Sequence, residues 1–263
     1  MRINFFIAIL ACAIFVFGLL YFTKALPVAI VGKSLISLND WQENRQVAAK
    51  LDPTAFEQDV FDQFIASRQK QQLVDSLKIS YESADFEDEF KFYTLGKSQE
   101  YEKLLQNYFS GSDKLFYKYV VVPQIHDALL QIKYNSDPVL NSDAYTRAIN
   151  ILAKIASGEK FEDLAKTESE DQVSGQLGGD LGFITQGQLL PELDKAVMQA
   201  SLGQVHDQIV VSRLGMHILY PVETSEDDGQ KVRHIKHILV QTPGYESWLE
   251  QNLQDIRVWR LIR

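Results

Sequence analysis

The sequence predicts an α+β fold, in which a mostly helical first half precedes a second half with short antiparallel strands. The first indication is a helical spacing of apolar residues after Pro53, at Phe56, Val60, Phe61, Phe64 and Ile65. The second is a pair of hairpin signals between apolar runs, Arg213-Leu-Gly215 and Asp227-Asp-Gly229. Helices and antiparallel strands are therefore expected in separate parts of the chain.

The composition is that of a globular chain. The 263 residues are 46% hydrophobic and 23% charged, which excludes a collagen-like or wholly disordered protein. The net charge of −9 gives the whole chain no electrostatic footprint for nucleic acid, and no nucleic-acid partner is expected. The single cysteine, Cys12, excludes an intrachain disulfide or a CxxC redox pair.

The first 24 residues predict a transmembrane anchor. Ile3 to Phe22 is apolar apart from Asn4, and such a run at ~1.5 Å per residue spans the ~30 Å core of a bilayer. Arg2 before it favours a cytoplasmic N-terminus, so we expect a single-pass membrane protein with an extracytoplasmic body, periplasmic or on the cell-surface side. The alternatives are a cleaved signal peptide and a lipoprotein signal that ends at Cys12.

Residues 25–136 predict a strand pair followed by helices. Pro27 to Ser37 reads as strand, glycine turn and strand, and Ser37 or Asn39 is placed to cap the next helix. Asn135 to Pro138 breaks the last helix and predicts a domain boundary. The expected helices cover 40–51, 53–78, 84–109 with a break near Gly96, and 114–134.

Residues 137–242 predict a second domain, in which helices and short strands surround a glycine-rich loop at 169–182. After this domain, a helix over 245–255 and a strand over 257–262 are expected. Within it, the expected helices cover 142–156, 161–167 and 191–200, and the expected strands cover 183–184, 208–211, 216–222 and 232–241.

Six short motifs follow one another between Ala144 and Tyr220. They are Gly158 to Ala165, Ser169-Glu-Asp171, Gly178-Gly-Asp-Leu-Gly-Phe183, Gly187 to Glu192, Leu202-Gly-Gln-Val205 and Gly215-Met-His-Ile218. Their order and spacing resemble the parvulin type of peptidyl-prolyl cis-trans isomerase. The resemblance implies a four-stranded antiparallel sheet surrounded by helices, and an isomerase that needs no metal or other cofactor.

The flanking segments resemble the SurA family of extracytoplasmic foldases. This implies that residues 25–136 form a helical chaperone domain completed by residues 243–263, with the isomerase inserted between them. Val28 to Val31 is then the first strand of that domain, and Val258 to Ile262 is its last. The implied partners are unfolded or proline-containing polypeptides.

The parvulin resemblance also implies the site. Asp171 matches the acidic or cysteine position beside the reacting carbonyl, His217 matches one of the family's paired histidines, and Ser212 matches a nearby hydroxyl. The alternatives are that Asp171 is only a helix or loop cap and that His217 is a core histidine. The proline ring is expected against four apolar side chains, Leu181, Ile184, Leu189 and Leu193, where the family often has Met and Phe in place of Leu189 and Leu193.

The second histidine of the pair is displaced in the sequence. Parvulins begin with a strand that reads like His-Ile-Leu-Val, whereas here Lys236-His-Ile-Leu-Val240 follows the last strand of the domain through a tight turn. A hairpin places these two strands side by side. We therefore predict a circular permutation in which His237 faces His217; the alternative is the beginning of a second isomerase repeat.

Two classes of function follow from this sequence. The first is a peptidyl-prolyl isomerase and chaperone that assists the folding of exported proteins. The second is a holdase chaperone whose parvulin domain binds peptides without catalysing isomerisation. A weaker third interpretation is a domain that serves only to assemble one membrane complex.

Overall fold

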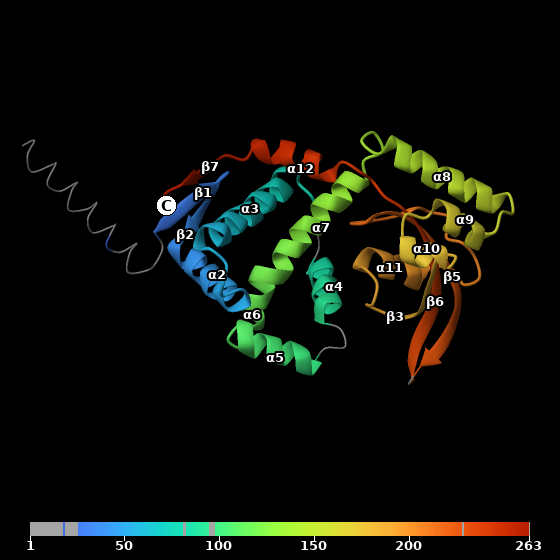
Figure 1. Cartoon of the computed structure of the whole chain (residues 1–263), viewed down its shortest axis with the longest axis horizontal. Helices are drawn as coiled ribbons and strands as arrows, with labels where there is room; N and C mark the ends of the chain where they lie inside the picture. The colour runs from blue at the N-terminus through green and yellow to red at the C-terminus, as the bar shows by residue number, and fades with distance from the viewer. Residues whose placement is uncertain (1–17, 19–25, 81–82, 95–97, 228, 263) are drawn as a thin grey trace, which may run out of the picture. The chain divides into compact units, whose positions relative to one another are not determined.

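The computed structural model describes residues 18, 26–80, 83–94, 98–227 and 229–262, which form helices and antiparallel sheets (Figure 1). The chain divides into two compact units. Among the described residues, unit 1 comprises 18, 26–77, 103–119 and 251–262, and unit 2 comprises the remainder from residue 78 to residue 250.

Unit 1 contains a three-stranded antiparallel sheet in the order β2-β1-β7. The central strand β1 (Pro27–Val31) pairs with β2 (Ser34–Ser37) and, across its other edge, with β7 (Val258–Arg260). Ala29 lies opposite both Ile36 and Arg260. The first strand and the last strand therefore lie in one sheet, which agrees with the expectation that both ends of the body belong to one domain.

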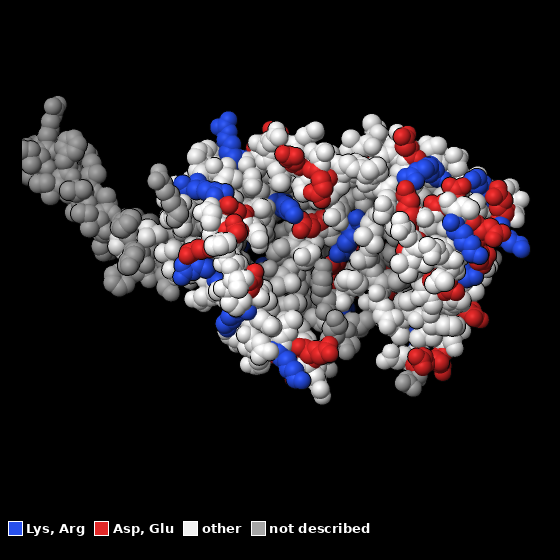
Figure 2. Space-filling model, in the orientation of Figure 1, with Lys and Arg blue, Asp and Glu red and all other residues white. Residues whose placement is uncertain are grey.

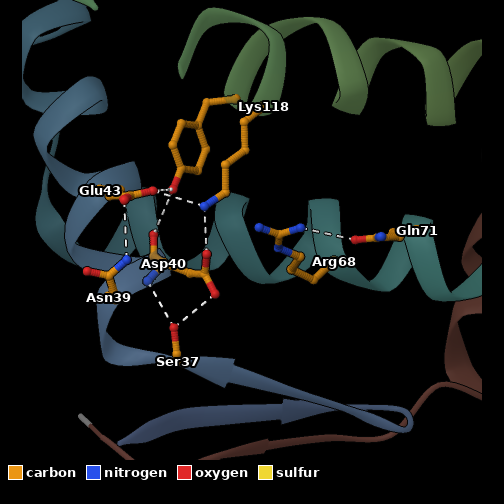
Figure 3. A network of polar contacts seen from close by, with 8 residues as sticks. Ser37, Asn39, Asp40, Glu43, Arg68, Gln71 and Lys118 are labelled. Atoms are coloured by element: carbon orange, nitrogen blue, oxygen red, sulfur yellow. Dashed lines mark hydrogen bonds and ion pairs between the residues drawn. The ribbon is translucent and has the colours of Figure 1, made fainter. Parts of the chain in front are cut away.

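Helix α2 (Leu38–Leu51) packs on this sheet through Trp41, and a polar network holds it there. Ser37 is its N-cap and accepts a hydrogen bond from the Asp40 backbone N–H at 3.1 Å. Lys118, from the π-helix η1 (Tyr117–Val121), reaches Asp40 and Glu43 at 2.7 and 2.9 Å (Figure 3). The other helices that contribute to unit 1 are α3 (Glu57–Ser76), α5 (Ser98–Tyr108) and α6 (Asp113–Phe116).

The helix expected from Pro53 begins later, at Glu57. Asp52 accepts hydrogen bonds from the backbone N–H and the hydroxyl of Thr54, at 2.9 and 2.6 Å. This local turn holds residues 52–54 out of the helix, because an aspartate side chain competes for backbone donors.

Unit 2 contains the four-stranded antiparallel sheet that the parvulin resemblance implies, with the strands in the order β3-β6-β5-β4. Strand β6 (Gln230–Val240) lies between β3 (Asp180–Thr185) and β5 (Gly215–Asp227), and β4 (Val210–Ser212) is an edge. The segment that carries the His-Ile-Leu-Val motif therefore supplies an inner strand. The helices are α4 (Ser83–Thr94), α7 (Val122–Asn135), α8 (Ser142–Ala156), α9 (Phe161–Glu168), α10 (Gln172–Gln176), α11 (Pro191–Gln199) and most of α12 (Tyr245–Gln254).

The two faces of this sheet are covered by different helices. Met216 and Ile218 of β5 pack with Ile238 of β6 against α8 and α9. Leu219 and Ile235 point to the opposite face and pack against α11. Because side chains alternate along a strand, His217 shares the α11 face with Leu219, and His237 shares it with Ile235.

Unit 2 is larger than the predicted domain at 137–242, since it includes α4, α7 and residues 243–250. Compactness alone does not define a folding domain, so the limits 25–136 and 137–242 stay predictions.

The predicted transmembrane helix, and the single-pass membrane localisation that followed from it, require correction. Among the described residues, no helix combines the length and the apolar composition needed to cross a membrane. The longest, α3, has 20 residues but carries charges from Glu57 to Asp75, and buried charges are costly in a bilayer. The segment from Ile3 to Phe22 lies outside the described residues, Gly18 excepted.

Candidate active site

Two buried histidines on neighbouring strands form the centre of the candidate site. His217 lies opposite Leu239 in the β5–β6 register, and His237 lies opposite Leu219, so the two histidines are diagonal neighbours on one face. Their Nδ1 atoms are 3.2 Å apart and their rings stack at a centroid distance of 5.4 Å. The predicted juxtaposition of His217 and His237 is confirmed.

Asp171 and Ser174 bind the outer nitrogen of His237. The His237 Nε2 atom lies 2.9 Å from both Asp171 Oδ2 and Ser174 Oγ, and the Ser174 hydroxyl donates to the same carboxylate oxygen at 2.6 Å. Asp171 is also the N-cap of α10, where it accepts from the Val173 backbone N–H at 3.1 Å. Asp171 therefore caps α10 and also contacts His237, so the two alternatives for this residue hold together.

Ser212 binds the other end of the histidine pair. Its Oγ atom lies 2.8 Å from His217 Nε2 and accepts the backbone N–H of Leu214 at 3.0 Å. Ser212 and His217 have no exposed surface, and His237 is 6% exposed. Ser212, His217, His237 and Asp171 thus form a row of hydrogen-bonded side chains. The side chain of Asp171 is 26% exposed, so Asp171 is the member of this row that a bound molecule can touch.

The chemistry of these groups sets the direction of the hydrogen bonds. An ionised Asp171 can only accept, so we assign the Nε2 proton of a neutral His237 to that contact. His237 Nδ1 then accepts from His217 Nδ1–H, and His217 Nε2 accepts from the Ser212 hydroxyl. Every donor in the row from Ser212 to Asp171 thereby points toward the carboxylate.

The pKa values agree with this assignment. Burial lowers the pKa of His217 to about 3, and the neighbouring His237 adds to the decrease. Burial also lowers the pKa of His237, although Asp171 acts in the opposite direction. For Asp171, burial raises the pKa, but hydrogen bonds from Ser174 and His237 outweigh it and lower the value to about 2. At neutral pH the site therefore holds two neutral imidazoles and one carboxylate.

The loop that carries Asp171 is held to β6 by backbone contacts. The N–H of Glu170 donates to the carbonyl of Leu239 at 2.8 Å, and the N–H of Leu239 donates to Ser169 Oγ at 3.1 Å. Farther along the loop, the N–H of His237 donates to the carbonyl of Gly179 at 2.8 Å. The position of Asp171 beside His237 therefore depends on the loop's backbone as well as on its side chains.

An apolar cluster continues from the histidine pair along the same sheet face. Leu193, which is 4% exposed, packs with Leu219 and Ile235, the residues two positions from His217 and His237. The remaining predicted pocket residues, Leu181, Ile184 and Leu189, pack around this cluster and are partly exposed. The structure thus brings all four predicted pocket residues together, and Leu193 is the most buried of them.

Ser174 is the site residue that the sequence analysis missed. It lies in the segment expected to be a loop, where α10 forms. The spacing of Asp171 and Ser174, three residues apart, is that of a helix cap and the third residue of the helix, and this signal could have identified the pair.

Charged side chains of both signs are intermixed on the face shown in Figure 2. Within the part of the chain that the structure describes, no three His, Cys, Asp or Glu side chains lie together so that they could hold a metal ion.

Comparisons with known proteins identify the fold around this site. Residues 116–225 match the family model of the PPIC-type PPIASE domain. The chain is 33% identical over 139 residues to the chaperone SurA of Chromobacterium violaceum, a match that covers 50% of this chain and 32% of that protein. It is 41% identical over 81 residues to the foldase protein PrsA 2 of Bacillus anthracis, a match that covers 31% of this chain and 28% of that protein.

Among solved structures, the peptidylprolyl isomerase PrsA from Bacillus anthracis is 19% identical, with a TM-score of 0.24, and the match covers 71% of this chain and 83% of that one. The matched segments span about a third of the length of the curated relatives. The expected resemblance to parvulin-type isomerases and SurA-like foldases is confirmed. Strand β6, with His237, lies beyond the residues that match the family model.

Proposed function

We propose that this chain, with its PPIC-type domain and its likeness to SurA chaperones and PrsA foldases, catalyses prolyl cis-trans isomerisation and assists the folding of exported polypeptides. The observation that carries this proposal is an ionised, partly exposed Asp171, held by His237 and Ser174 on the sheet face that also bears the leucine cluster. In the proposed complex the proline ring packs on the apolar cluster, and its peptide bond lies beside the Asp171 carboxylate.

The reaction requires rotation about an amide bond with a barrier of roughly 18–20 kcal/mol. The planar amide places partial negative charge on its oxygen, and rotation removes part of that charge. A carboxylate beside the carbonyl oxygen therefore destabilises the planar state more than the twisted one. An apolar surface favours the twisted, less polar state in the same direction.

The proposed roles follow from exposure. Asp171 is the catalytic residue, because its side chain can contact the substrate. His237, His217 and Ser212 are buried beneath it and act as positioning residues, which fix the carboxylate and keep it ionised. Leu181, Ile184 and Leu189 bind the proline ring above Leu193. No cofactor takes part in the proposed reaction.

The test is exchange NMR on short Xaa-Pro peptides with the full chain, Asp171→Ala, and Glu162→Gln as the control. Glu162 pairs with Lys236, whose side chain lies on the opposite sheet face from His237. We expect the parent and the control to accelerate exchange, and Asp171→Ala to lose about 10²-fold of that acceleration. If the parent catalysed none of the peptides, or if Asp171→Ala matched it, the isomerase proposal would fail.

A second candidate function, a holdase chaperone, is favoured by an apolar row on the unit 1 sheet. Leu35, Ile30 and Trp259 are cross-strand neighbours, and Leu35 and Trp259 are 68% and 48% exposed. Exposed apolar rows of this kind can bind unfolded chains. Suppression of client aggregation that persists in Asp171→Ala but is lost in a Leu35→Ser, Trp259→Ser variant would support this function, and an absence of suppression by the parent would exclude it.

A further inference from the structure

The side chain of Asn135, the last residue of α7, joins two strand ends beside the histidine pair. Asn135 is 3% exposed. Its Nδ2 atom donates to the backbone carbonyl of Ser212 at 2.7 Å, and its Oδ1 atom accepts from the hydroxyl of Thr242 at 2.5 Å. A single amide thus links the end of β4 to the segment that follows β6.

Tyr134, the preceding residue, holds the same exit segment. Its hydroxyl donates to the carbonyl of Pro243 at 2.5 Å. Its ring packs against Tyr245 and Trp248 at centroid distances of 5.8 and 5.6 Å. The contacts of Tyr134 therefore fix the position of Thr242 relative to α7 without help from the Asn135 amide. What the Asn135 amide controls is the orientation of Ser212.

The chain order shows which segments the Asn135 amide joins. Strand β6 enters the sheet from the C-terminal side, so the chain that leaves α7 at Asn135 leads to α8 and not to β6. The end of β4 is held to the end of β6 through β5, by the pairs Ser212–Gly215 and Met216–Val240, and the Asn135 amide adds a link that does not pass through β5. Ser212 carries both the carbonyl that Asn135 holds and the hydroxyl that binds His217, so a shift of its backbone moves that hydroxyl.

We propose that Asn135 is a positioning residue for the histidine pair: its amide fixes Ser212 against the end of β6 and thereby maintains the donor order from Ser212 through His217 to His237. An asparagine supplies one donor and one acceptor at this site, and both are used, whereas an aspartate of the same size cannot donate to Ser212. The kinetic consequence rests on the proposed function; the effect on the imidazole protons does not.

The experiment compares Asn135→Asp, Thr242→Val and a control, Asn141→Asp, in the full chain. Asn141 is 4% exposed and donates to the carbonyls of Tyr134 and Asp137, at 2.6 and 3.2 Å. The control therefore removes a buried amide donor close to α7 while the Asn135 amide and both of its partners stay in the chain. The readouts are the ¹⁵N chemical shifts of the His217 ring, which report its tautomer, and kcat and KM for a prolyl peptide.

We expect Asn135→Asp to convert His217 from one tautomer to a mixture and to lower kcat about tenfold with KM changed less than about twofold, since small displacements of positioning groups act on the chemical step. Thr242→Val is expected to change the His217 tautomer and kcat in the same direction and to a smaller degree. If Asn135→Asp does not fold, Thr242→Val alone tests the role of Asn135. Asn141→Asp lowers stability and leaves the His217 tautomer unchanged.

An unchanged His217 tautomer in Asn135→Asp, or an equal change in Asn141→Asp, would overturn the proposal. If the parent chain catalyses none of the peptides, the proposed function fails, while the tautomer comparison still decides the role of Asn135.

Discussion

Gly179 and His237 approach so closely that only a glycine fits. The N–H of His237 donates to the Gly179 carbonyl at 2.8 Å, and a Cβ atom on Gly179 would overlap the His237 carbonyl oxygen. Gly179 also has a φ of +82°, a conformation that side chains disfavour. The Gly178-Gly-Asp-Leu-Gly motif is thus explained in part by backbone contact with the strand that carries the second histidine.

The first prediction compares two glycines of this motif. Gly179→Ala is expected to destabilise unit 2 by about 3 kcal/mol or more, from overlap and left-handed strain together. Gly182, with φ +77° and nothing within 4 Å of a built Cβ, carries only the strain, so Gly182→Ala is expected to cost about 1 kcal/mol. Urea unfolding measures both, and equal losses would contradict the assigned contact.

The second prediction concerns stability against pH. His217 titrates near 6.5 when unfolded and at about 3 when folded, so the unfolded chain binds the extra proton between these values. The contribution of His217 to the free energy of unfolding is therefore fully present above about pH 6.5. It falls as the pH decreases toward 3, with a slope of up to about 1.4 kcal/mol per pH unit.

Urea unfolding from pH 4 to pH 8 measures this slope, and His217→Gln is expected to reduce it. A parent chain whose stability stays constant from pH 6.5 down to pH 4.5 would show that neither histidine is buried in its neutral form. Asp171 contributes in a different window, because its lowered pKa gives stability that is present above 3.8 and is lost toward pH 2.

The third prediction concerns Ser174, which donates to Asp171 at 2.6 Å. Ser174→Ala removes a donor that favours the ionised carboxylate, so the pKa of Asp171 is expected to rise toward its ordinary value. Loss of this buried hydrogen bond is expected to cost about 1 kcal/mol of stability. A ¹³C NMR titration of the Asp171 carboxyl checks the direction; an unchanged or lowered pKa would show that Ser174 does not stabilise the charge.

The fourth prediction concerns a buried ion pair in unit 2. Both nitrogens at the end of the Arg213 side chain donate to Glu89 of α4 at 2.6 Å, and Arg213 also donates to Glu192 at 3.2 Å. The side chains of Arg213 and Glu89 are 13% and 5% exposed. Glu89→Ala leaves a buried guanidinium with fewer partners, and the expected loss of stability is about 3 kcal/mol.

The matched control is the surface pair Arg45–Glu57, whose side chains are 53% and 63% exposed. Glu57→Ala is expected to cost less than about 1 kcal/mol, and that cost should vanish at high salt. Chemical denaturation of both variants at low and high salt compares the pairs. Similar small losses would mean that Arg213 is hydrated.

The parts of the site that the sequence predicted are those carried by local patterns. The parvulin resemblance implied that the histidine of the His-Ile-Leu-Val motif pairs with His217, and the turn expected at Asp227 to Gly229 placed the two strands side by side. The helix expected over 142–156 has those same limits in the structure, since its apolar face repeats regularly against the sheet. At these positions the local sequence pattern and the packing against the sheet favour the same structure.

The parts that the sequence did not predict depend on contacts between distant residues or on short-range competition. Glu89 meets Arg213 across 124 positions, and no periodicity relates them. Ser174 acquires its role only because a single helical turn, α10, forms in a glycine-rich loop. Pro53 was expected to open a helix, and the side chain of Asp52 holds a turn there instead.

The last prediction tests whether β6 is needed to complete the four-stranded sheet of unit 2. A chain that ends at Asp227 keeps every residue that matches the PPIC family model but lacks β6. Ile235, Ile238 and Val240 of β6 are fully buried, and loss of such side chains from the core costs about 2 kcal/mol each. Together with the lost pairing of β6 with β3 and with β5, this is comparable to the whole stability of a domain, about 5–15 kcal/mol.

We therefore expect the chain ending at Asp227 to lose the dispersed amide NMR spectrum of unit 2. A chain ending at Glu250, which keeps β6 and the segment that Tyr134 contacts, is the control and is expected to retain that spectrum. A peptide of residues 229–242 added to the shorter chain should restore part of it, because β3 and β5 would then regain their shared neighbour. A well-dispersed spectrum and cooperative unfolding in the shorter chain alone would show that the sheet closes without β6, and that His237 is not required to complete the fold.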